Sequence, residues 1–347
     1  MPEVITDVLR SAESDGISET EALQLLKGIR TTSEFSELAR VASKVRDEEV
    51  GPLFKFDGFM GSLTPCNMNP PCKYCSRSAG NRPDFADRTL TIDEVELGAR
   101  LIAETGTKRV EIGGGTSREG AGEKIISAVQ AIRKVSSMDI WVNVGPSLTR
   151  EDLIKLKELG VKEVASSLET INPEVFREAK PGDSLEARMK LAEEINEVGL
   201  GLNSVIMVGL GSSYEDYVKH IFWLKKFENL SHVCITGLNP IPGTPFEKRP
   251  MANPFEVAKV GAVARLVLRT LDISFGGMMN DPRLLPLWIM AGANRAIHLG
   301  AHVHRAGSWR IHHAGAIIER NGDVEFVNML PLTTRIVREM GMEADVE

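Results

Sequence analysis

Three of the four cysteines in the chain lie close together, as Cys66, Cys72 and Cys75. They follow the spacing Cys-x5-Cys-x2-Cys within the stretch FMGSLTPCNMNPPCKYCSRSAG. Three thiolates can hold three irons of a [4Fe-4S] cluster and leave the fourth iron open to a small molecule. The spacing therefore predicts redox chemistry at iron, with these three cysteines as metal ligands and catalytic residues.

The same cysteines could instead form a structural zinc site or part of a disulfide framework. A closed zinc site needs a fourth ligand nearby, whereas the next histidine is His220 and the next cysteine is Cys234. Disulfide frameworks are typical of short secreted chains rich in cysteine, and this chain has four cysteines in 347 residues. Both alternatives are therefore disfavoured against an iron-sulfur cluster.

Composition excludes several other classes of protein. The 41 basic and 48 acidic residues give a net charge of −7, which offers no general footprint for nucleic acid or an anionic membrane. The beginning of the chain has no signal-peptide pattern, and no stretch approaches the roughly 20 apolar residues of a membrane helix. We expect a cytoplasmic protein that acts on a small molecule, in a reducing and anaerobic cell interior that preserves the cluster.

The elements that must position the cysteines alternate between short β-rich runs and longer helical ones. This alternation predicts an α/β fold, a (β/α) TIM-type barrel, complete or partial, with function at the carboxyl ends of its strands. The predicted domains are an N-terminal helical cap at 1–50, a barrel at 51–300 and a C-terminal closing segment at 301–347. Candidate strands cover residues 59–64, 109–112, 140–144, 163–168, 201–208, 233–237 and 273–275, with a candidate eighth near 296–299.

Local signals mark the two ends of this barrel. Thr31 and Glu34 fit a capping box at the start of a helix, and a similar start lies at 18–21. Near the end of the chain, Asn321-Gly322 between apolar runs predicts a β-hairpin. A short closing helix is expected at 333–341.

The last turn of the cysteine segment reads Cys-Lys-Tyr-Cys, with Tyr74 directly before the third cysteine. This ending resembles the radical S-adenosylmethionine (SAM) enzymes, in which an aromatic residue here lies beside the adenine of SAM. The usual spacing in that superfamily is C-x3-C-x2-C, so the first gap is two residues longer here and contains Pro70-Pro71. The resemblance implies a [4Fe-4S] cluster, SAM and a one-electron reductant such as ferredoxin.

A run of glycines, Gly113, Gly114 and Gly115, follows the second candidate strand. Glycine lets a backbone come close to a ligand and leaves its polar groups accessible, although such a run is often only a turn. One βα unit after the cysteines, it resembles the radical SAM glycine motif, which contacts the methionyl amino group of SAM.

Further resemblance follows in the order found in the biotin-synthase and hydrogenase-maturase branch. The segments Ser-Leu-Glu-Thr at 167–170 and Ile-Met-Val-Gly at 206–209 flank an arginine at 188. The resemblance implies that Glu169 touches the ribose or amino group of SAM, that Arg188 binds its carboxylate, and that Ile206, Val208 and Gly209 lie along its adenine. On its own, Glu169 could equally begin a helix or form a salt bridge. Residues 239–245 resemble the N-P-x-P-G-T-P loop of the same branch.

The remaining cysteine and the histidines have less specific signals. Cys234 falls inside a candidate strand, where core packing is the commoner role, and one spare cysteine argues against a second, all-cysteine cluster as sulfur donor. Five histidines between 298 and 313 match no firm metal spacing and have arginine neighbours, so we favour an anion-binding or substrate-facing role for some of them. Candidate substrate residues are Asn143, Asn280, His302 and Arg305.

The cysteine spacing, the helical cap and the segments GANRAIHLGAH and NMLPLTTRIV most resemble the HmdB type of radical SAM protein, also called HcgA. This implies reductive cleavage of SAM to a 5'-deoxyadenosyl radical, hydrogen abstraction from a substrate, and a role in making or modifying the pyridinol of the iron-guanylylpyridinol cofactor of [Fe]-hydrogenase. Alternatives are a lipoyl-synthase-like or methylornithine-synthase-like enzyme, or a non-catalytic iron-sulfur scaffold.

Overall fold

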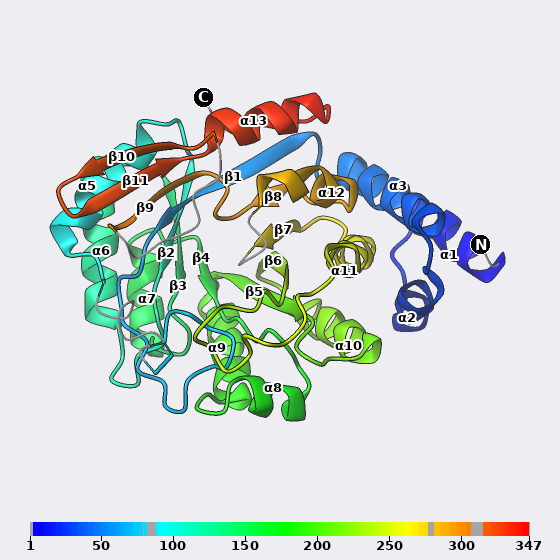
Figure 1. Cartoon of the computed structure of the whole chain (residues 1–347), viewed down its shortest axis with the longest axis horizontal. Coiled ribbons are helices and arrows are strands. Elements are labelled where there is room, and N and C mark those ends of the chain that lie inside the picture. Colours follow the sequence, from blue (N-terminus) through cyan, green and yellow to red (C-terminus); the bar gives the residue numbers. More distant parts are fainter. Residues whose placement is uncertain (1–2, 79, 82–87, 277–280, 307–314, 347) are drawn as a thin grey trace.

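Eight parallel strands form a closed barrel in the computed structural model, which describes residues 3–78, 80–81, 88–276, 281–306 and 315–346 (Figure 1). Consecutive strands pair in parallel, and β8 pairs with both β7 and β1, which closes the ring. The predicted TIM-type barrel is therefore confirmed, in its complete form. The strands are β1 Leu53–Met60, β2 Arg109–Gly113, β3 Asp139–Asn143, β4 Glu163–Ala165, β5 Gly201–Val208, β6 Leu230–Gly237, β7 Asp272–Gly276 and β8 Arg295–Ala296.

Helices surround the barrel and bury their apolar faces against it. Three of them, α5, α7 and α10, begin at capping boxes, in which a Thr or Ser side chain and the acidic residue three positions later satisfy each other's backbone groups. The outer helices are α5 Ile92–Ala103, α6 Gly122–Val135, α7 Arg150–Glu158, α8 Pro173–Ala179, α9 Leu185–Val198, α10 Tyr214–Leu224, α11 Pro254–Val267 and α12 Leu285–Met290.

Three helices precede the barrel: α1 Glu3–Ser14, α2 Glu19–Gly28 and α3 Thr32–Glu49. The predicted helix starts are confirmed, because Ser18 and Thr31 both form capping boxes. These helices pack on the side of the barrel that carries α10, α11 and α12 (Figure 1), with Phe35 of α3 only 4.2 Å from Phe255 between ring centroids.

The end of the chain adds β9 Ala301–Arg305, β10 Ile317–Asn321, β11 Val324–Asn328, α13 Leu330–Glu339 and β12 Glu343–Ala344. The predicted hairpin around Asn321 is confirmed as β10 and β11. Strand β9 runs parallel to the end of β1, and β12 runs parallel to its beginning. The first barrel strand therefore has four neighbours, three of which come from the last quarter of the described chain.

The first strand lies earlier in the sequence than predicted, at 53–60 rather than 59–64. Phe54 and Phe56 pack outward in the main core. Lys55 and Asp57 alternate with them and face the interior, where Lys55 bonds to Asp272 at 2.8 Å. A barrel strand is expected to be apolar on both faces. The inward charges break that pattern, so the beginning of this strand could not be recognised from its hydrophobicity.

Charged side chains fill part of the barrel interior. Arg295 is fully buried and bonds to the carboxylates of Asp57 at 2.7 Å and Glu163 at 2.8 Å. Trp141 donates its indole N–H to Asp57 at 3.0 Å. Such a paired network satisfies charges that could not be buried singly.

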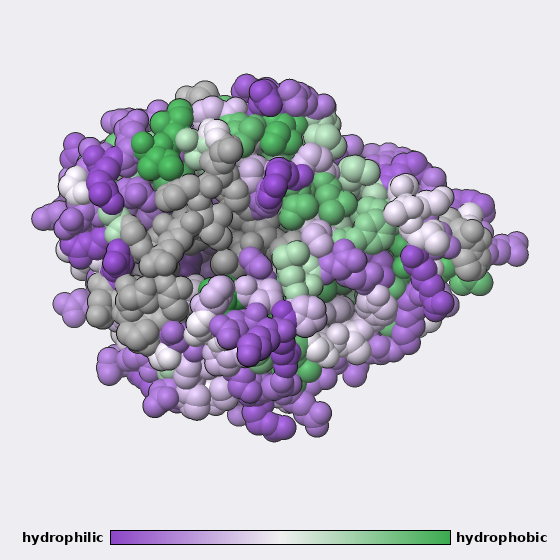
Figure 2. All heavy atoms as spheres, in the orientation of Figure 1, coloured by the Kyte–Doolittle hydropathy of each residue, from purple (hydrophilic) through white to green (hydrophobic). Residues whose placement is uncertain are grey.

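Hydrophilic residues cover much of the face seen in Figure 2, with apolar groups gathered over the hairpin and α12. Ile317 and Ile318 of β10 are the exposed apolar residues of the hairpin. None of the helices in the described ranges is long and apolar enough to cross a membrane.

Candidate active site

The cysteine segment leaves β1 and crosses to the carboxyl end of β2. The N–H of Leu63 donates to the carbonyl of Gly113 at 2.9 Å, and the N–H of Gly115 donates to the carbonyl of Thr64 at 2.8 Å. The hydroxyl of Thr64 donates to the carbonyl of Gly115 at 2.8 Å. These bonds fix Cys66 over the end of the second strand.

The glycine run is required for this close approach. A β-carbon at Gly113 would lie 2.6 Å from the ring of Phe59, and β-carbons at Gly114 and Gly115 would overlap Thr64 and Cys66. Packing alone therefore demands glycine at all three positions. The contact with SAM that the resemblance implies for them stays a prediction.

Hydrogen bonds between nearby residues hold the turn that carries Cys72 and Cys75. The N–H of Cys75 donates to the carbonyl of Cys72 at 3.2 Å, and the side-chain amide of Asn81 donates to both of their carbonyls, at 2.8 and 2.7 Å. The N–H of Arg77 points at the sulfur of Cys75, 3.4 Å away. All four cysteines of the chain are free thiols.

The electrostatics of these thiols suit a cationic cofactor. Burial raises the pKa of Cys72 to about 12 and also raises the pKa of Cys75. The charge of Cys75 raises the pKa of Cys72 further, and the charge of Cys66 raises the pKa of Cys75 further. Three thiolates gathered here need a positive partner, which the irons of a [4Fe-4S] cluster would supply. The residues present therefore fit the cluster.

A single metal ion fits less well. Among the described residues, no three His, Cys, Asp or Glu side chains lie close enough to hold one metal ion. In a cluster each thiolate binds a different iron, so the sulfurs stand farther apart than around zinc.

The long gap between Cys66 and Cys72 has its own support. Arg118 donates to the carbonyl of Asn69 at 2.6 Å, and a β-carbon at Gly182 would overlap the carbonyl of Pro70. The turn between α8 and α9 thus packs directly on Asn69 and Pro70 within this gap.

Glu169 lies just after β4, at a backbone φ of 62°, and extends the pairing with β5. Its N–H donates to the carbonyl of Val205, and its carbonyl accepts from Met207, both at 2.9 Å. Its carboxylate bonds to the ammonium of Lys180, which is 2% exposed. A left-handed non-glycine residue is uncommon and is held here by the surrounding structure.

Arg188 is buried beside this pair. Its Nε and Nη2 bond to the carboxylate of Asp183 at 2.7 and 2.6 Å, and its Nη1 donates to the carbonyl of Ser167 at 2.7 Å. Burial acts to raise the pKa of Asp183, but the charges of Arg188 and Lys180 outweigh it and the pKa is lowered. The structure thus brings Glu169 and Arg188 together near the cysteines.

The three residues expected along the adenine lie at the end of β5. The side chain of Ile206 is buried in the core outside the barrel, so only its backbone, which pairs with Glu169, faces this region. Gly209 has a φ of 95°, and its N–H donates to the hydroxyl of Tyr217 at 3.3 Å. Val208 is buried, and Tyr74 is partly buried against the same core.

Comparison with known proteins decides the family. Residues 64–224 match the model of the radical SAM superfamily. A biotin synthase of Pelotomaculum thermopropionicum is 30% identical over 242 residues, covering 68% of this chain and 74% of its own. The chain belongs to the radical SAM superfamily. As a radical SAM enzyme, it shares the family's [4Fe-4S] cluster and SAM.

Other similar proteins span most of the chain. The uncharacterized protein MJ0785 of Methanocaldococcus jannaschii is 32% identical over 287 residues, which covers 78% of this chain and 76% of its own. Two solved structures share the fold. Methylornithine synthase (PylB) has a TM-score of 0.79 at 20% identity and covers 99% and 97% of the two chains. The maturase HydG from Carboxydothermus hydrogenoformans has a TM-score of 0.79 at 21% identity and covers 98% and 79%.

The barrel interior next to the cysteines is polar. Glu111 accepts hydrogen bonds from Asn143 at 3.1 Å and pairs with His298 at 3.0 Å. Burial acts to raise the pKa of Glu111, but the charge of His298 and these bonds lower it overall. The rings of His298 and His302 lie 4.5 and 6.1 Å from the ring of Phe59.

The candidate substrate residues lie in different parts of the structure. Asn143 and His302 face this interior. Arg305 lies apart from them, between Glu94 at 3.4 Å and Asp323 at 3.5 Å. Asn280 lies outside the described residues. Glu111 and Lys180 were not predicted as site residues from the sequence. The only signal for Glu111 was a charge inside a strand, and the only signal for Lys180 was a charge after a short helix.

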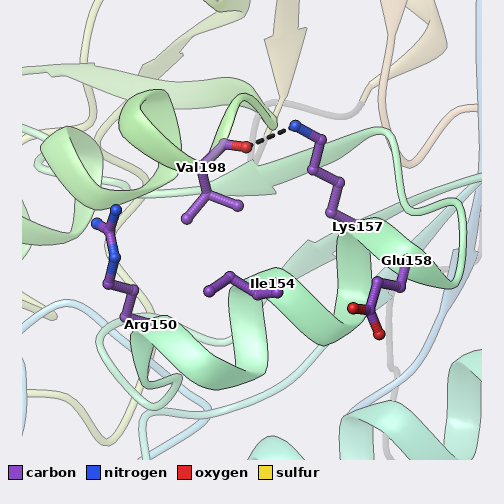
Figure 3. Close-up of a pocket in the computed structure, with 5 residues that line it drawn as sticks. All are labelled: Arg150, Ile154, Lys157, Glu158 and Val198. Atoms are coloured by element: carbon purple, nitrogen blue, oxygen red, sulfur yellow. Dashed lines mark hydrogen bonds between the residues drawn. The ribbon is translucent and has the colours of Figure 1, made fainter.

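A surface pocket on α7 and α9 plays no part in this site. It has a volume of about 530 Å³ and lies between α7 and α9, on the outside of the barrel (Figure 3). Its wall includes the exposed Ile154, with the ammonium of Lys157 bonded to the carbonyl of Val198 at 2.6 Å. None of its residues is a cysteine ligand or a predicted SAM contact.

Proposed function

We propose that this radical SAM enzyme is of the HmdB type and acts in biosynthesis of the iron-guanylylpyridinol cofactor of [Fe]-hydrogenase, in formation or modification of the pyridinol. The observation that carries the proposal is the five-residue gap between Cys66 and Cys72. Its support by Arg118 and Gly182 makes the gap a built feature of the fold rather than a loose insertion.

In the proposed mechanism Cys66, Cys72 and Cys75 hold the cluster. When bound, the cluster supplies the electron that cleaves SAM reductively to methionine and a 5'-deoxyadenosyl radical, which abstracts hydrogen from the substrate. The protein contributes binding, orientation and exclusion of water.

Arg188 and Glu169 would orient SAM. A guanidinium has five N–H donors, and the structure assigns three of them, to Asp183 and Ser167. The two remaining donors can bind the SAM carboxylate, because a planar guanidinium can donate to both oxygens of a carboxylate. Lys180 takes one oxygen of Glu169, and the other oxygen can accept from the ribose or amino group of SAM.

The reaction of the biotin synthase relatives is not carried over. An all-cysteine sulfur-donor cluster would need several cysteines besides the triad, and this chain has only Cys234. That thiol is 2% exposed and lies in an apolar cluster with Trp141, Ala165 and Ile297.

The test begins with anaerobic reconstitution with iron and sulfide, reduction with SAM, and assay of 5'-deoxyadenosine in the wild type and Cys72→Ala. Candidate pyridinol precursors labelled with deuterium are then added. We expect deoxyadenosine from the wild type alone, and deuterium transfer from a pyridinol precursor into it. Deuterium transfer from lysine or dethiobiotin instead would reject the HmdB assignment. A full, reducible cluster that leaves SAM intact with every precursor would also count against the proposal.

A further inference from the structure

The side chain of Arg77 connects the cysteine segment with the barrel interior. It comes two residues after Cys75, and its guanidinium carbon lies 5.2 Å from the centre of the Phe59 ring. A β-carbon at Gly113 would be 3.5 Å from its Nη1. The guanidinium is therefore at the carboxyl ends of β1 and β2, on the side of the barrel where Glu111 and His298 lie.

Within the described ranges, Arg77 differs from Arg188, Arg295 and Arg109 in having no anionic partner. Arg188 bonds to Asp183, Arg295 to Asp57 and Arg109 to Asp345. Within the described ranges, the half-buried side chain of Arg77 forms neither an ion pair nor a hydrogen bond, and its contact is the Phe59 ring.

The neighbouring carboxylate does not fill this role. Both oxygens of Glu111 are already bonded, one to Asn143 and one to His298. Arg77 does not bond to Glu111, and its positive charge is one of several causes that lower the pKa of that carboxyl. The N–H donors of this half-buried guanidinium have no protein partner within the described ranges and are left to solvent or to an anion that binds there.

We propose that Arg77, supported by Phe59, is the binding subsite for an anionic group, a carboxylate or phosphate, of the small-molecule substrate. The inference rests on the proposed function only in assuming that the substrate enters the barrel beside the cluster. A planar guanidinium can bind two oxygens of either group. Its place on the cysteine segment would hold the anionic end of the substrate close to SAM.

The test measures binding of two simple probes, benzoate and phenyl phosphate, to the cluster-loaded full chain by anaerobic calorimetry, with and without SAM. Benzamide serves as the uncharged comparison. The variants are Arg77→Met and Arg77→Lys, with Arg150→Met as a matched control because Arg150 pairs with Glu197 on the outer surface. Because the probes are not turned over, the result does not depend on SAM cleavage or on the identity of the pathway.

We expect one probe to bind the wild type, and the preferred probe identifies the group as carboxylate or phosphate. Its affinity should fall by about tenfold to a hundredfold in Arg77→Met, the loss of a charged bidentate contact. Arg77→Lys should be intermediate and Arg150→Met unchanged. Benzamide should bind more weakly than benzoate to the wild type and equally to all four proteins.

Three results would overturn the proposal. The first is a wild type that binds neither anion, or an Arg77→Met variant that binds both unchanged. The second is a shift of the cluster's reduction potential in Arg77→Met with unchanged anion affinity, which would make Arg77 a counter-charge of the cluster. The third is a fall in the melting temperature of Arg77→Met that Glu111→Gln reverses, with anion affinity again unchanged, which would make Arg77 a counter-charge of Glu111.

Discussion

Gly115 and Cys66 touch backbone to backbone, so that a β-carbon on the glycine would overlap the nitrogen and Cα of the cysteine. Gly115→Ala should therefore push the cysteine segment off the end of β2 and reduce cluster loading severalfold, with the barrel still folded. Iron content and visible absorbance after reconstitution measure this loss. Gly16→Ala is the matched control, because its nearest neighbour is 4.0 Å away. Normal iron content in Gly115→Ala would contradict the expectation.

Lys180→Met should be strongly destabilising. The ammonium is buried, bonds to Glu169 and lies 3.7 Å from Asp183. Its loss leaves two buried carboxylates facing Arg188 alone, and breaking a buried ion pair from one side costs about 3 to 5 kcal/mol. Urea unfolding of the apoprotein gives the change in the free energy of unfolding. Lys180→Arg should recover part of it, and a loss within about 0.5 kcal/mol for Lys180→Met would show that the pair contributes little.

His220 should make the fold sensitive to acid. It is 1% exposed in α10, neither ring nitrogen has a partner within the described structure, and burial lowers its pKa to about 3. Since its folded pKa lies below its unfolded value, the unfolded state binds the proton first, and stability falls as the pH drops below about 6.5 towards 3, by about 1.4 kcal/mol per pH unit. In unfolding experiments across this range, His220→Leu should lose that part of the slope. Parallel pH profiles for the two proteins would refute it.

Cys234→Ala should leave the cluster intact. The thiol packs inside the barrel with Trp141 and Ile297 rather than with the other cysteines. We expect about four irons per chain, an unchanged electron paramagnetic resonance spectrum, and a stability loss of about 1 kcal/mol from the small cavity. Cys75→Ala, in contrast, should fail to assemble the cluster. Loss of iron from Cys234→Ala would assign that thiol a ligand role.

Features with local causes could be predicted from the sequence. The capping boxes at Ser18 and Thr31 and the hairpin at Asn321 each depend on a few neighbouring residues. The barrel followed from the alternation of strands and helices, because parallel strands need helical crossovers. The bounds of β1 were wrong, because inward charges replace the expected apolar residues, and β4 ends at Ala165 rather than at the predicted 168.

Features that depend on distant segments could not be predicted. Glu111 meets His298 across 187 positions of the chain, and Lys180 reaches Glu169 only because α8 ends beside it. Arg305 illustrates the opposite error: it follows His302 closely in sequence, yet Glu94 and Asp323 hold it away from the barrel interior. Strand register and helix ends, rather than residue type, decide these contacts.

Strand β1 is hydrogen-bonded to β8, β9 and β12, all of them more than 230 positions later in the sequence. During synthesis on the ribosome, Leu53–Met60 therefore emerges long before three of its four neighbours exist, while β2 arrives early. Until those strands have been made, one edge of β1 stays unpaired, and unpaired strand edges favour aggregation. The nascent chain should thus depend on rapid translation or chaperone protection until its last fifth has been made.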